Sequence, residues 1–90
     1  MASAFVGTVS FVGPLHENVT KAQSYVETGI WAVEIDGVQF YWSHTRFDVG
    51  QMVDCSPNDG ISRGGAYRGK DRMVITLPNV SELRGPALPR

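Results

Sequence analysis

The sequence has a single cysteine, Cys55, and no apolar run long enough to cross a bilayer. A lone thiol cannot form an internal disulfide, which excludes the disulfide-stabilised class of small secreted domains. The longest unbroken apolar runs are as short as IWAV, and the first residues, MASAFVGTVSFVG, lack the basic start and continuous apolar segment of a signal peptide. These absences predict a reduced, cytoplasmic protein that does not enter a membrane.

Candidate catalytic and metal-binding side chains are also scarce. Beyond carboxylates and hydroxyls, only His16, His44 and Cys55 could act as nucleophile, base or soft ligand. A zinc site takes three or four ligands in closely spaced pairs, and the sequence has neither Cys-x-x-Cys nor His-x-x-x-His. The run RGGAYRGK lacks the spacing of a phosphate-binding loop and precedes a predicted strand instead of a helix. We expect no enzyme activity, no metal and no cofactor.

Charge of either sign is sparse. Charged residues make up 19% of the chain and the formal net charge is −1, so no global field draws the protein to nucleic acid. The balance is uneven, because residues 1–45 hold one Lys against four acids and residues 46–90 hold seven cations against five acids. Within residues 62–72 four cations accompany one acid. Any contact with phosphate is therefore expected to be local and of moderate strength.

Strand patterning is the strongest positive signal. Apolar residues make up 42% of the 90 residues, which is enough for one domain that folds alone or as a small oligomer such as a homodimer. Residues 5–12 alternate as a strand does, with Phe5 and Val9 on the same face. Pro14 should end that strand, and the polar residues 13–24, GPLHENVTKAQS, predict a loop.

The segment GIWAVEIDGVQFYWSHT predicts a hairpin. Asp36-Gly37 separates two β-rich runs as a two-residue type I′ turn requires, and such a turn pairs Ile35 with Val38. One face of the hairpin is then apolar and aromatic: Trp31, Val33, Ile35, Val38, Phe40 and Trp42. The other face is mixed: Ile30, Ala32, Glu34, Gln39, Tyr41 and Ser43. Both tryptophans are predicted core residues, and Tyr41 is predicted to stand on the exposed, mixed face.

Two further strands are predicted in the second half of the sequence. Val53 and Cys55 share one face of a short strand, which the turn-forming residues 57–60 should end. Residues 73–77 alternate in polarity and predict a last strand that ends at Pro78.

Five predicted strands and no long helix indicate an all-β protein. We expect one β-barrel domain over residues 1–80 and a flexible, proline-bearing tail over residues 81–90. Five strands of this length can close as a small antiparallel barrel of the OB type, with an SH3-like barrel as the alternative. The segment RFDVGQ leaves little room for the helix that usually follows the third strand of an OB-fold.

Two short motifs resemble OB-fold proteins. The Gly-x-Val of VGTV is similar to the first-strand glycine of many OB-folds, and FDVGQMV is similar to the turn before their fourth strand. Small phage and plasmid single-stranded-DNA-binding proteins belong to this group, so the resemblance implies oligonucleotide binding. It covers scattered residues of a few strands, and the acidic C-terminal tail common in bacterial members is absent.

The segment SRGGAYRGKDR, residues 62–72, is the main candidate site. Single-stranded nucleic acid is held by cationic grooves and aromatic faces, and the loop between strands four and five of an OB-fold borders the binding cleft. In that interpretation Tyr67 stacks on a base. The phosphate contacts would come from four cations: Arg63, Arg68, Lys70 and Arg72. The alternative is a solvated hairpin loop whose glycines supply turns and whose cations supply solubility.

Two other tyrosines extend this candidate site. Tyr41 on the mixed face is placed to stack on a base, although Glu34 on the same face opposes phosphate. Tyr25 would flank the cleft or anchor the first loop to the core. We expect a non-enzymatic module that binds single-stranded nucleic acid, above all DNA. The near-neutral charge favours the alternative, a small inhibitor or adaptor of phage or plasmid type that binds a protein partner through the mixed face.

Overall fold

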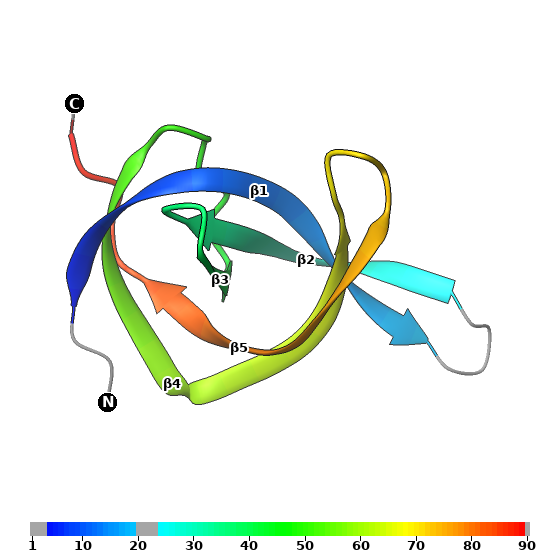
Figure 1. Cartoon of the computed structure of the whole chain (residues 1–90). Helices are drawn as coiled ribbons and strands as arrows, with labels where there is room; N and C mark the ends of the chain where they lie inside the picture. The colour runs from blue at the N-terminus through cyan, green and yellow to red at the C-terminus, as the bar shows by residue number, and fades with distance from the viewer. Residues whose placement is uncertain (1–3, 20–23, 90) are drawn as a thin grey trace.

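The computed structural model describes residues 4–19 and 24–89. Its strands are β1 (Phe5–Val19), β2 (Ser24–Ile35), β3 (Gln39–Ser43), β4 (Met52–Arg68) and β5 (Val74–Arg84). They form one sheet that closes into a ring in the order β1-β2-β3-β5-β4, with β4 back beside β1 (Figure 1). The predictions of an all-β chain and of five strands are confirmed, and the described residues include no helix. The predicted barrel is antiparallel throughout, whereas β1 pairs with β4 and β3 pairs with β5 as parallel strands.

Strand β1 is much longer than its apolar pattern predicts. It continues through Pro14 over residues 13–19, which the sequence predicts as loop, while residues 20–23 of that loop lie outside the described residues. Pro14 sits where the β1–β2 register shifts, and proline is tolerated at such irregular positions. The buried Leu15 follows it, and its carbonyl accepts a hydrogen bond from Thr28 Oγ1 at 2.9 Å. Strands β1 and β2 therefore form a long hairpin that extends beyond the ring (Figure 1).

The turn between β2 and β3 lies where the sequence predicts it. Asp36 and Gly37 have φ angles of 56° and 71°, and the Val38 N–H donates to the Ile35 carbonyl at 3.1 Å. The next pair is different, because Ile35 pairs with Gln39 and not with Val38. Val38 is an extra residue that opposes no partner, and its side chain is 82% exposed. The turn is confirmed and the predicted register is wrong by one residue.

That extra residue moves every β3 side chain to the other face. Tyr41 lies opposite Val33, and Trp42 lies opposite Ala32. Because side chains alternate along a strand, a slip of one residue exchanges the two faces of β3 relative to β2. The two tryptophans therefore lie on different faces, which corrects the prediction that they share one.

The interior contains two apolar clusters. The first cluster consists of Val9, Val33, Ile35, Tyr41, Phe47, Val53, Cys55 and Leu83. The second cluster consists of Leu15, Ile30, Ala32, Trp42, Tyr67, Leu77 and Val80. Successive residues of β2 alternate between them, so this strand is covered on both faces. The predicted mixed face does not exist as one surface: Ala32, Tyr41 and Ser43 are buried at 0%, 8% and 2% exposure, whereas Glu34 is half-buried and Gln39 is exposed.

Strands β4 and β5 form a second long hairpin. Val53 and Cys55 are both buried on one face, as predicted, but β4 continues through the predicted turn 57–60 without ending. Strand β5 likewise continues through Pro78, so the predicted domain boundary at residue 80 falls inside a strand.

The residues after β5 also contact the sheet. Ala87 forms a bridge with Val53, and the Leu88 N–H donates to the Met52 carbonyl at 2.9 Å. Residues 81–84 belong to β5, and the chain that follows lies along the start of β4. The described part of the predicted tail is therefore hydrogen-bonded to the domain.

Candidate nucleic-acid interface

Three neighbouring strands place two phenylalanines and a glutamate in one row. Phe11 of β1 pairs with Glu34 of β2, and Glu34 pairs with Phe40 of β3. Tyr67 of β4 packs against both phenylalanines, with ring centroids 5.2 Å from Phe11 and 5.0 Å from Phe40. Phe11 and Phe40 are half-buried, so part of each ring faces outward. This arrangement gives a small aromatic floor on the second cluster.

The aromatic floor opens into a pocket of about 420 Å³, which we call the aromatic pocket. Its walls come from the row, from Tyr67 and from the connection between β4 and β5. The full lining is Phe11, Glu34, Phe40, Tyr67, Gly69, Lys70, Asp71 and Ile75. A cationic turn therefore lies directly beside aromatic rings from three other strands.

The connection between β4 and β5, residues 69–73, is a tight turn. The Gly69 N–H donates to the Met73 carbonyl at 2.8 Å, and the Arg72 N–H donates to the Gly69 carbonyl at 2.9 Å. Arg72 has a φ of 67°, a conformation that is easy for glycine and costly for a residue with a Cβ atom. An arginine in this position carries a charge at the tip at some cost in stability.

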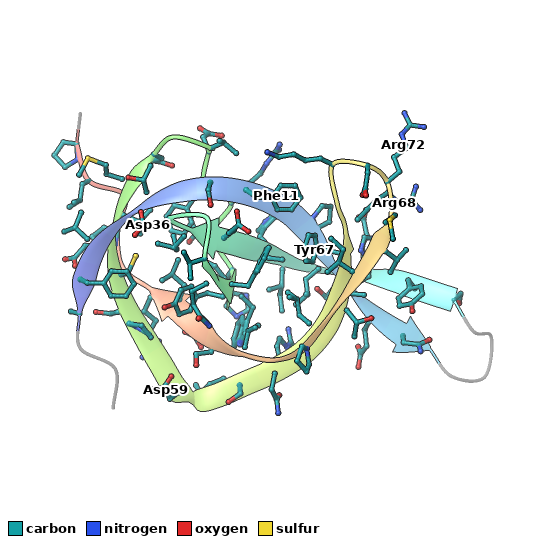
Figure 2. All side chains as sticks on the ribbon, in the orientation of Figure 1. Phe11, Asp36, Asp59, Tyr67, Arg68 and Arg72 are labelled. Atoms are coloured by element: carbon teal, nitrogen blue, oxygen red, sulfur yellow. The ribbon has the colours of Figure 1, made fainter. Side chains whose placement is uncertain are left out.

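Three exposed cations surround this turn. Arg68, Lys70 and Arg72 are all exposed, and none of them forms an ion pair with the residues that the structure describes. Figure 2 shows Arg68 and Arg72 at the end of the β4–β5 hairpin, on the same side of the molecule as Tyr67. These charges are available to an anionic ligand without first breaking a salt bridge.

Glu34 is the one acid in the row itself. Its Oε1 atom accepts a hydrogen bond from Ser10 Oγ at 2.7 Å, and Ser10 Oγ accepts one from the Gly37 N–H at 2.8 Å. The carboxylate is half-buried and close enough to Tyr67 to affect it electrostatically. Burial, and secondarily the charge of Glu34, raise the pKa of the Tyr67 hydroxyl.

Tyr67 and Arg63 do not lie in a flexible loop as predicted. Both belong to strand β4, and Tyr67 is only 4% exposed, so it supports the aromatic floor and cannot offer a free face to a base. The Arg63 guanidinium stacks 5.0 Å from the centre of the Trp42 ring, and its Nη1 atom is buried with no hydrogen-bond partner among the described residues. Arg63 does not line the aromatic pocket.

Tyr41 is also placed differently from the prediction. It is 8% exposed in the first cluster, because the extra residue in the turn directs it inward beside Val33. Burial, followed by the nearby charges of Cys55 and Asp59, raises the pKa of its hydroxyl. A stacking role for Tyr41 is therefore ruled out by its position.

Tyr25 is the one predicted tyrosine with an exposed ring, at 46%. It lines a smaller pocket together with His16, Tyr67 and Arg68. Tyr67 is shared by this pocket and the aromatic pocket, so the two are adjacent. Of the seven predicted site residues, the structure brings five together around the β4–β5 turn: Tyr25, Tyr67, Arg68, Lys70 and Arg72.

Sequence reasoning missed Phe11 and Phe40, and it treated Glu34 only as an obstacle to phosphate. The type I′ register places Phe40 on the buried core face, whereas the observed register pairs it with Glu34. Assuming one bulged residue at Val38 in the predicted hairpin would have placed Phe40 opposite Glu34. Nothing in the sequence DGVQ distinguishes such a bulge from a regular two-residue turn.

The cysteine and the two histidines do not line the aromatic pocket. Cys55 is fully buried, burial raises the pKa of its thiol, and its Sγ atom lies 3.4 Å from the Val53 carbonyl. The Nε2 atom of His16 lies 3.8 Å from Oε1 of Glu27, and the His44 ring packs edge-on against the Trp42 ring. Among residues 4–19 and 24–89, no three His, Cys, Asp or Glu side chains are grouped so as to hold a metal ion. The same ranges include no helix long and apolar enough to span a membrane.

Comparisons of the chain with protein-family models, with curated proteins and with solved structures give no match.

Proposed function

We propose that this chain is a non-enzymatic, OB-like module that binds single-stranded DNA at the aromatic pocket and the β4–β5 turn. The main observation behind this proposal is that half-buried aromatic rings lie beside cations that form no ion pair with the described residues. Phe11 and Phe40 offer ring surface on which a base can stack, and Lys70 lies on the wall of the same pocket. Proteins hold single strands by stacking the bases on aromatic rings and by placing cations along the backbone.

The strand order supports the OB-like assignment. Read from β4, the ring runs β4-β1-β2-β3, which is the strand order of a Greek key, and within it β1, β2 and β3 are antiparallel neighbours while β4 is paired with β1 as a parallel strand. The OB-fold is a five-stranded Greek-key barrel that binds oligonucleotides on the face of its second and third strands and with the loop between strands four and five. Glu34 and Phe40 belong to β2 and β3, and the aromatic pocket includes the β4–β5 turn.

The charge distribution predicts moderate, salt-sensitive binding. The net charge is −1, so the attraction comes from the free cations around the turn and not from the whole molecule. Three phosphate contacts, from Arg68, Lys70 and Arg72, give a slope of log affinity against log salt of about −2 for a single strand.

The test is fluorescence anisotropy of labelled oligothymidylate over a range of salt concentrations. Lys70→Ser combined with Arg72→Ser should weaken binding and make the salt slope shallower by about 1.4. The matched control is Arg46→Ser combined with Arg84→Ser, which removes the same charge from side chains outside the aromatic pocket. The proposal is wrong if the wild-type protein binds neither oligothymidylate nor oligocytidylate, or if the two double variants behave alike.

A protein partner is the second candidate function. Three consecutive apolar residues after the turn are exposed: Met73 at 63%, Val74 at 46% and Ile75 at 38%. An exposed apolar run beside cations is also typical of a surface that contacts another protein. Absence of DNA binding, together with capture of a protein partner that is lost on Val74→Ser, would favour this alternative.

A further inference from the structure

The aromatic pocket is lined by two carboxylates, and phosphate binding does not explain the one on its floor. Asp71 is exposed on the turn, where its Oδ1 atom accepts a hydrogen bond from the Met73 N–H at 3.0 Å. Glu34 lies between its ladder partners Phe11 and Phe40, at the centre of the aromatic floor. A negative charge there repels phosphate and offsets the attraction of Lys70 in the same pocket. If a nucleotide occupies the pocket, the group next to Glu34 must be a hydrogen-bond donor and not part of the backbone.

Hydrogen bonds fix this carboxylate and leave one of its oxygens for a ligand. Ser10 Oγ donates to Oε1, and the Gly37 N–H holds Ser10 in position. Neither ion pair in the described residues involves Glu34, and Oε2 accepts no hydrogen bond from them. A half-buried carboxylate gains most from a donor that approaches from the pocket side, because charge-assisted hydrogen bonds are stronger away from bulk water.

The four bases differ in the donors that they offer to such an acceptor. Cytosine, adenine and guanine each carry an exocyclic amino group, whereas thymine has a carbonyl oxygen where cytosine has its amino group. A carboxylate accepts from the amino group and repels the carbonyl oxygen. The one ring donor on that edge of thymine, its N3–H, lies between two carbonyl oxygens, both of which repel a carboxylate. The comparison of cytosine with thymine is the sharpest, because the two rings are nearly equal in size and stack over a similar area.

We propose that Glu34 is a specificity-determining residue that makes the aromatic pocket select bases with an exocyclic amino group. This inference rests on the proposed binding of single-stranded DNA. Phe11 and Phe40 stack on the ring of the base, and Glu34 accepts a hydrogen bond from its edge. One charge-assisted hydrogen bond predicts that oligocytidylate binds about tenfold more tightly than oligothymidylate.

The experiment compares the anisotropy of labelled oligocytidylate and oligothymidylate, each of about eight nucleotides. The wild-type protein, Glu34→Gln and a control, Asp48→Asn, are measured with both strands. The glutamine keeps an oxygen that can accept the Ser10 hydrogen bond, and it places a neutral amide in the pocket. Asp48 is exposed and does not line the pocket, so its variant removes the same charge from another part of the surface.

The expected result is a preference for oligocytidylate in the wild type and in Asp48→Asn, and its loss or reversal in Glu34→Gln. Reversal is possible because the glutamine amide donates to the thymine carbonyl. If both strands bind equally well to the wild type, or if Glu34→Gln keeps the preference, the inference is overturned and the proposed function stands. If neither strand binds, the proposed function fails and the inference fails with it.

Discussion

The two parts of the segment 62–73 have similar residue types and very different surroundings. Residues 62–68 are the end of strand β4, where Tyr67 is buried in the second cluster and Arg63 is stacked on Trp42. Residues 69–73 are a turn, where Lys70 and Arg72 are exposed and have no ion-pair partner in the described chain. The first part supports the fold except at its last residue, the exposed Arg68, and the second part is available to a ligand.

This difference shows that composition alone does not define a binding loop. Glycine next to arginine suggests a flexible cationic finger, but here Gly64 and Gly65 are packing positions. A Cβ atom at Gly65 would lie 2.7 Å from Leu15 Cδ1, and one at Gly64 would meet the Pro78 carbonyl oxygen. The strand can approach its neighbours at these positions because it has no side chain there.

The largest expected effect comes from Tyr67→Ala. Removing a buried aromatic side chain from the second cluster should lower the free energy of unfolding by about 3–5 kcal/mol. The exposed Tyr25→Ala is the matched control and should change it by about 0.5 kcal/mol or less. Chemical denaturation measures both. Equal, small effects would mean that Tyr67 is not part of the core and that the two parts of the segment do not differ as described.

Gly64→Ala should have the next largest effect on stability. The new methyl group would meet the backbone carbonyl of Pro78, which cannot move without disturbing β5, and the expected loss of stability is about 1–3 kcal/mol. Gly60→Ala is the control, because the nearest atom to its Cβ is Asn58 Oδ1 at 3.5 Å. If thermal melts of the two variants coincide, Gly64 is not a packing position.

Arg72→Gly should have a smaller effect of opposite sign. Glycine adopts a φ of 67° without the strain of a Cβ atom, so the variant should gain about 1 kcal/mol in stability. It should also bind single-stranded DNA more weakly, since it loses one phosphate contact. A variant that is more stable and binds less tightly would show that the arginine is kept for its charge. Loss of stability would contradict the described turn.

The last prediction concerns pH. A change of pH below about 9 should alter the free energy of unfolding least of all the changes considered, and a change above about 9 should alter it more. Burial raises the pKa of Cys55, Tyr41 and Tyr67 above their ordinary values of 9.0, 10.0 and 10.0. The unfolded chain therefore loses these protons first, so stability is retained below those values and falls as the pH rises through them. Denaturation midpoints measured from neutral to alkaline pH test this, and Cys55→Ala should remove the earliest part of the decline.

Local chemistry was enough to predict several parts of this molecule. Alternation identified the strands around Val53 and Cys55, and the preference of Asp-Gly for positive φ located the turn at residues 36–37. The exposed cations Lys70 and Arg72 were also expected from the sequence.

The rest depended on contacts between distant parts of the chain. The two long hairpins cover the second face of β2, and that burial cannot be seen in the pattern of β2 itself. The bulge at Val38 reversed the positions of Tyr41 and Phe40, because one added residue exchanges the faces of a strand. Phe11 and Phe40 could therefore be recognised as a pair only after the register was known.

The central claim is that one surface binds single-stranded DNA, namely the aromatic pocket with the β4–β5 turn. The most direct test is an NMR titration of isotope-labelled protein with a short single-stranded oligonucleotide. The account predicts that the largest amide shift changes fall on Phe11, Glu34, Phe40 and residues 69–73, while the first cluster and the chain around Arg84 change little. Shift changes centred elsewhere on the surface, or none at saturating DNA, would contradict it.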